Sequence, residues 1–123
     1  SMAATLATIR ELEKGDICQK LFNLGEKFRN LLDEVIANLK LRAQIVGFGS
    51  VFQLLFTDKE IYDYRDVLTS NTEWFKKFQK EMMNRGIFFI PQANKRWHLS
   101  AAHTIEDLRY TIECAREVLE NMK

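Results

Sequence analysis

The sequence predicts a single α+β domain, 1–123, in which a small antiparallel or mixed sheet is covered by helices. Three observations predict this class. A length of 123 residues is common for one domain. Four stretches repeat apolar residues three and four positions apart, as amphipathic helices do. Two other stretches, 43–57 and 87–100, are rich in β-branched and aromatic residues. Runs of strands with helices before, between and after them favour the α+β class.

Two helices are predicted before the first strands. Ala3–Lys14 is helical in pattern and ends at Gly15, a residue suited to a left-handed C-cap. Asp16 then starts a second helix, and Gln19, three residues later, completes a capping box. The apolar residues of this second helix recur at helical spacing: Ile17, Leu21, Leu24, Phe28, Leu31, Leu32, Val35 and Leu39.

The period changes between residues 43 and 57, where β-forming residues predict strands. Gly47 and Gly49 interrupt this stretch and indicate a bulge, a tight turn or the close approach of another backbone. The following segment, Asp58–Thr69, is polar and is predicted to be a surface connection. Ser70, with Glu73 three residues on, is then predicted to open a helix through a second capping box. Its inward residues are expected to be Trp74, Phe75, Phe78 and Met82.

Two short strands and a final helix complete the predicted fold. Gly86 ends the preceding helix, and Ile87–Ile90 is too short and too apolar for another helix, so it is predicted to be a buried strand that Pro91 stops. A further strand is predicted at Arg96–Ser100. Thr104, with Asp107 at the third position, caps the last helix. The apolar stripe of that helix is Ile105, Leu108, Ile112, Ala115, Leu119 and Met122.

Composition excludes several classes of function. The 18 basic and 17 acidic side chains are interspersed, and without a basic run nucleic acid is not an expected partner. No segment approaches the ~18 apolar residues that span a bilayer, so no membrane partner is expected either. No signal peptide opens the chain. Cys18 and Cys114 are expected to be buried, reduced thiols, which favours a cytoplasmic location.

Few residues could carry chemistry. His98 and His103 are the only histidines, and no cysteine or acidic residue lies at ligand spacing around them, so a metal site is not expected. His103 is expected to hydrogen-bond across the turn before the last helix. Asn94, Lys95 and Arg96 form a concentrated polar patch between two apolar strands. They are either a solvated hairpin tip or a clamp for an anion or carboxylate at a cleft.

Four stretches carry a family resemblance. Ser1–Thr8 resembles a helix that follows a G-N-P motif. Gly49–Thr57 resembles a G-S-M-F…F-F-T strand, and Tyr64–Asp66 a Y-x-D element. Residues 86–107 join a G-[VI]-[FY]-x-x-P strand to S-x-A-H-T-x-E-D without a gap. In this order the motifs resemble the C-terminal small domain of glutamate-1-semialdehyde aminomutase and related class III pyridoxal-phosphate-dependent aminotransferases (transaminases).

The resemblance implies a fold-type-I parent enzyme of which this chain is a piece beginning at the small-domain boundary. Pyridoxal phosphate would be held by a larger N-terminal domain, which is the expected partner, and the parent would be a homodimer. None of the ten lysines in this chain would form the aldimine. No residue of the chain is therefore expected to be catalytic or to bind the cofactor, and the chain alone would be inactive. Its expected role is to cap and shape the substrate end of the active site, while the cofactor supplies the chemistry.

One departure from the family pattern concerns the loop after Pro91. In the aminomutase this loop carries a glutamate near the substrate, and in an ungapped comparison that glutamate falls on Lys95. Asn94 and Arg96 are its neighbours. The replacement of an anion by cations implies a carboxylate-bearing substrate and favours an aminotransferase over the aminomutase. The alternative is a stand-alone α+β ligand-binding or protein-interaction module without catalysis.

Overall fold

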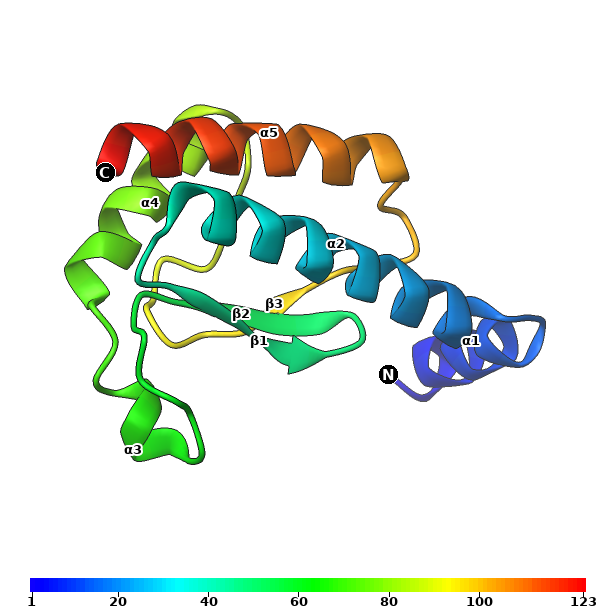
Figure 1. Cartoon of the computed structure of the whole chain (residues 1–123). Coiled ribbons are helices and arrows are strands. Elements are labelled where there is room, and N and C mark those ends of the chain that lie inside the picture. Colours follow the sequence, from blue (N-terminus) through cyan, green and yellow to red (C-terminus); the bar gives the residue numbers. More distant parts are fainter.

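A computed structural model describes all 123 residues and confirms the α+β class (Figure 1). The three strands form one antiparallel sheet in the order β1-β2-β3. In Figure 1, α2 and α5 run side by side over one face of the sheet, whereas α1 and α3 project at opposite ends. The elements are α1 (Met2–Glu13), α2 (Ile17–Leu39), β1 (Gln44–Phe48), β2 (Val51–Leu55), α3 (Tyr64–Val67), α4 (Thr72–Asn84), β3 (Trp97–His98) and α5 (Ile105–Met122).

The core lies between the sheet and the helices that cover it. It consists of apolar side chains, many of them from the predicted apolar stripes of the helices. Their burial is the main stabilising contribution to the fold. Phe78 and Leu108, both predicted to point inward, are fully buried. Trp74 and Ile112, also predicted to be inward, are only half-buried and pack at the edge of the core. The largest fully buried side chains are Phe52, Phe78, Leu32, Leu54, Leu55, Met82, Leu108, Leu119 and Val118.

The hairpin of β1 and β2 accounts for the glycines of the first β-rich stretch. Gly49 and Ser50 form the two-residue turn, and Gly49 has a φ of 53°. A Cβ on Gly47, whose φ is 154°, would lie 2.4 Å from the carbonyl oxygen of Val51 on the facing strand. The tight turn and the close backbone approach are therefore both present.

The end of α1 and the start of α2 differ from their predictions. Gly15 follows α1 but is not left-handed. Asp16 precedes α2, but its backbone (φ −93°, ψ 28°) is not extended as a capping residue's is, so its side chain caps nothing. Lys20 binds that carboxylate at 2.9 Å instead, and the capping box with Gln19 does not form.

The cap of α4 lies one residue later than predicted. Asn71, not Ser70, is the capping residue, and its Oδ1 accepts a hydrogen bond from the amide of Trp74 at 3.1 Å. The hydroxyl of Ser70 is used elsewhere, because it donates to Asn94 Oδ1 at 3.2 Å. By contrast, the capping box of α5 forms as predicted, with Thr104 and Asp107 bonded to each other's backbone amides.

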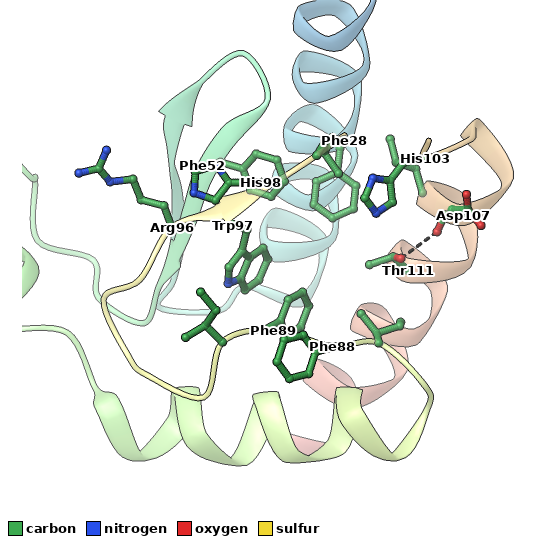
Figure 2. Close-up of a pocket in the computed structure, with 14 residues that line it drawn as sticks. Phe28, Phe52, Phe88, Phe89, Arg96, Trp97, His98, His103, Asp107 and Thr111 are labelled. Carbon is green, nitrogen blue, oxygen red and sulfur yellow. Dashed lines mark hydrogen bonds between the residues drawn. The ribbon is translucent and has the colours of Figure 1, made fainter. Parts of the chain in front are cut away.

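The prediction of a buried strand at Ile87–Ile90 is wrong. The segment has no regular secondary structure and joins no sheet, and Phe88 is 71% exposed. The inward ring of Phe89 stacks on Trp97 with centroids 4.2 Å apart, so side chains rather than a backbone ladder connect this segment to β3 (Figure 2). The predicted strand at Arg96–Ser100 is correspondingly reduced to Trp97–His98, which pairs with β2.

The two cysteines have different environments. Cys114 is buried in the core, as predicted, whereas Cys18 is exposed near the start of α2, so the prediction for Cys18 is wrong. Its neighbours Ile17 and Leu21 are half-buried, whereas the side chain of Cys18 is open to solvent. None of the helices combines the length and apolar character that crossing a membrane requires.

Candidate functional site

The turn between Pro91 and β3 carries the polar patch predicted from the sequence. Asn94 is left-handed, with a φ of 68°, a conformation that asparagine tolerates better than most residues. Its side-chain oxygen accepts the hydrogen bond from Ser70, which ties the turn to the residues just before α4. Asn94 is half-buried, whereas Lys95 and Arg96 are exposed and form no ion pair. The turn therefore presents two unpaired cations on a fixed backbone.

All three predicted residues line one hollow of about 390 Å³. Tyr64, from the short helix α3, and His98, from β3, line the same hollow. The hollow brings together residues from α3, the turn and β3. The first and last of them, Tyr64 and His98, are 34 positions apart in the sequence. It is open to solvent, and Figure 2 shows Arg96 extending away from the neighbouring aromatic cluster.

The electrostatics of this hollow favour an anion. Its lining contains Lys95 and Arg96 but no acidic side chain. The acidic residues on either side of Tyr64 are already bound: Asp63 Oδ1 accepts hydrogen bonds from the amides of Arg65 and Asp66, and Lys59 Nζ lies 2.5 Å from Asp66 Oδ1. That hydrogen bond, together with amides at the start of α3, lowers the pKa of Asp66 from its ordinary value. Lysine, arginine and a tyrosine hydroxyl are groups that bind carboxylates and phosphates.

A second, more apolar hollow of about 270 Å³ shares Arg96 and His98 with the first (Figure 2). Its walls include Phe28, Phe52 and Trp97. His103 stands at its rim, and its role agrees with the prediction: Nδ1 accepts a hydrogen bond from the amide of Ser100 at 3.0 Å and lies 3.1 Å from the hydroxyl of Ser100.

The arrangement can bind but shows no catalytic constellation. The only acidic side chain at either hollow is Asp107, whose carboxylate accepts hydrogen bonds from the amide and hydroxyl of Thr104. No three His, Cys, Asp or Glu side chains gather where they could hold a metal ion. The chemistry that the site supports is therefore the recognition and positioning of an anionic group.

Tyr64 and His98 were not predicted as site residues. Tyr64 lies 30 positions before Asn94, and only the path of the chain through α4 brings the two together. The Y-x-D resemblance at Tyr64–Asp66 was the signal that could have drawn attention to it. His98 was considered only as a metal ligand, whereas its position beside Arg96 could have suggested an anion site.

No family model matches the chain. In sequence it is 32% identical over 122 residues to glutamate-1-semialdehyde 2,1-aminomutase from Desulfitobacterium hafniense (strain DSM 10664 / DCB-2). This match covers 99% of the chain but 28% of the aminomutase. The chain thus spans little more than a quarter of the length of this curated relative.

Solved structures show the same fold. An omega-transaminase from Sphaerobacter thermophilus superposes with a TM-score of 0.87 at 24% identity, over 97% of this chain and 27% of that one. A glutamate-1-semialdehyde aminomutase (K286A) from Pseudomonas aeruginosa PAO1 in complex with PMP gives a TM-score of 0.80 at 17% identity, over 89% and 24%.

These comparisons confirm the resemblance carried by the four sequence motifs. Along its whole length the chain is similar in sequence to one domain-sized part of glutamate-1-semialdehyde 2,1-aminomutase, and it shares the fold of the corresponding part of the solved transaminase and aminomutase structures.

Proposed function

We propose that this chain is the C-terminal small domain of a pyridoxal-phosphate-dependent aminotransferase or aminomutase-like enzyme, and that it caps and shapes the substrate end of the active site. The observation that carries the proposal is the match with an aminomutase, which runs along 99% of the chain but takes up 28% of that enzyme. The remaining part of such an enzyme would be the partner of this domain.

The cofactor of the parent would be pyridoxal phosphate. PMP, present in one structural neighbour, is the aminated form of the same cofactor. The cofactor supplies an electron sink, and the protein supplies a lysine for the Schiff base and a partner for the pyridine nitrogen. We expect no residue of this chain to take those two roles. Lys95 is the only lysine at either hollow, and the only carboxylate there, Asp107, is held by Thr104.

Reconstitution with the cofactor tests this division of labour. Pyridoxal phosphate added to the 123-residue chain should give no protein-dependent absorbance band, whereas the longer parent enzyme should form a stoichiometric internal aldimine. A stoichiometric aldimine band with the chain alone would refute the proposal. The stand-alone module remains the competing function, and a reading frame that starts at Met2 without an upstream cofactor domain would favour it.

We also propose that Asn94, Lys95 and Arg96 face the substrate entrance of the parent and select a carboxylate-bearing substrate. Support comes from the unpaired Lys95 and Arg96 at an acid-free hollow. Lys95→Glu in the parent should raise KM for a dicarboxylic substrate several-fold and change kcat little, because the lost contact is made equally in ground and transition states.

The matched control is Lys80→Glu, which makes the same charge change at an exposed position on α4 away from both hollows. KM should stay unchanged in that variant. Equal KM values for the wild type and Lys95→Glu, with every keto acid tried, would mean that Lys95 is only a solvated hairpin tip.

The homodimeric state and cytoplasmic location of the parent follow from the resemblance and belong to the same proposal. Sedimentation of the longer parent enzyme should give twice the mass of one chain. A monomeric parent with full activity would contradict the dimer without affecting the role proposed for this domain.

A further inference from the structure

The segment Ile87–Ile90 runs between two ends that are fixed by backbone hydrogen bonds. At its start, the amide of Ile87 donates to the carbonyl of Met82 at 3.0 Å, and the amide of Gly86 donates to Met83 at 2.9 Å. This pair of bonds around a left-handed glycine closes the end of α4 as a Schellman motif. At its other end, the amide of Gln92 donates to the carbonyl of Ile90 at 2.7 Å.

Between these ends the backbone has no partner. No hydrogen bond involves the N–H or C=O of Phe88 or Phe89. The side chains nevertheless alternate as in a strand. Phe89 faces the core against Trp97, while Phe88 and Ile90 on the opposite side are 71% and 48% exposed. The segment thus has the side-chain alternation of a strand but lacks a neighbouring strand.

We propose that Ile87–Ile90 is an edge to which a strand from the remainder of the parent enzyme adds, through backbone hydrogen bonds to Phe88 or Phe89 and apolar contacts with Phe88 and Ile90. The inference rests on the proposed function, because the occupant is a segment outside these 123 residues. Strand addition to an exposed edge is a common mode of recognition, in which the backbone provides affinity and alternate side chains provide register.

Three observations support this occupant. The curated relative is several times longer than the chain, so most of its polypeptide is available to cover this edge. Gly86–Pro91 contains no charged residue, its central residues Ile87–Ile90 have high β-propensity, and proteins generally do not leave such an edge open. Because both ends of the segment are already fixed, pairing would order little additional backbone. The unpaired Lys95 and Arg96 nearby favour an added strand with an acidic residue at that end.

Amide hydrogen exchange, measured on the 123-residue chain and on the longer parent, tests the proposal. The amide of Phe88, Phe89 or Ile90 should be protected in the parent, with exchange slowed on the order of 100-fold relative to the chain alone. The amide of Ile87 is the internal control, because it is already bonded to Met82 and should be protected in both.

Unchanged exchange of all three amides would overturn the proposal. Protection that appears in the chain alone and rises with its concentration would also overturn it, because a second copy would then be the occupant. The aldimine absorbance of the parent, measured on the same preparation, distinguishes failure of the added strand from failure of the proposed function. An aldimine band with unprotected amides would refute only the added strand, and protected amides without a band would refute only the proposed function.

Discussion

Gly25 is the residue at which α2 passes closest to the hairpin of β1 and β2. A Cβ at this position would lie 2.0 Å from the carbonyl oxygen of Gly49 and 2.8 Å from the Cα of Ser50. Both are backbone atoms, so a change of side-chain rotamer cannot relieve the clash. One turn later, Arg29 fixes the same contact by donating a hydrogen bond from Nη1 to the carbonyl of Gly47 at 2.9 Å.

Gly25→Ala should therefore lower the free energy of unfolding, although alanine is the better helix former. The gain in helix propensity is about 1 kcal/mol, whereas overpacking against fixed backbone costs roughly 1–3 kcal/mol or more. Gly15→Ala is the matched control, since no atom lies within 4 Å of the added Cβ and its φ is not left-handed. Urea denaturation should show a loss for Gly25→Ala and little change for Gly15→Ala. Equal midpoints for the two variants would contradict the close approach.

Predictions from the sequence were most accurate at single residues whose chemistry is local. The hydrogen bond of His103 to Ser100 and the capping box of Thr104 join residues three positions apart, so their types and spacing suffice. Gly25 could not be found in this way. Its importance comes from the hairpin carbonyl against it, which is distant in sequence, and in the helical pattern of α2 it is only a weak helix former.

Among the elements, α5 has the best-defined beginning. The amide of Thr104 donates to Asp107 Oδ2 at 2.8 Å and its hydroxyl donates to the same oxygen at 2.9 Å. These bonds lower the pKa of Asp107 from its ordinary value of 3.8. Because the pKa is lower in the folded state, the charged carboxylate stabilises the fold above the ordinary pKa. That contribution is lost as the pH falls through the folded-state pKa.

Asp107→Asn should accordingly make the stability of the fold less dependent on pH in the acidic range. Tm measured between about pH 6 and pH 2 should fall less steeply for the variant than for the wild type. Glu106→Gln, which removes a carboxylate from the same turn outside the capping box, is the control and should retain the wild-type slope. If Asp107→Asn and the wild type lost Tm in parallel on acidification, the capping bonds would not be the cause.

Helices could be predicted better than strands because their apolar period is internal to the segment. The stripes of α2, α4 and α5 are all found at the predicted places. A strand also needs a neighbour, and the composition of Ile87–Ile90 does not reveal that none is present. The clustering of Asn94, Lys95 and Arg96 could be predicted from the sequence because the three residues are consecutive. The approach of Tyr64 to them depends on where α3 lies and could not.

At the scale of the whole molecule, α1 stands apart from the core. No residue of α1 is buried, and its apolar residues Leu6, Ile9 and Leu12 are 48%, 46% and 43% exposed. Phe48, at the tip of the hairpin, is 76% exposed. The central strand of the sheet is less exposed than the hairpin tip, since four of the five residues of β2 are buried. Apart from Phe88 and Ile90, the α1 residues and Phe48 therefore offer apolar surface for association, rather than the outer face of the strands.

The isolated chain should self-associate through this surface, because exposed apolar groups are removed from water when two copies meet. Replacing Leu6 and Ile9 together with glutamine should shift sedimentation toward the monomer. The free energy of unfolding measured at low concentration should hardly change, since neither side chain is buried. Leu32→Ala is the contrasting control: Leu32 is fully buried, so its truncation should cost about 2–5 kcal/mol of stability. Sedimentation of the wild-type chain as a clean monomer at high concentration would contradict the prediction, and association undiminished in the Leu6/Ile9 variant would assign the contact to another face.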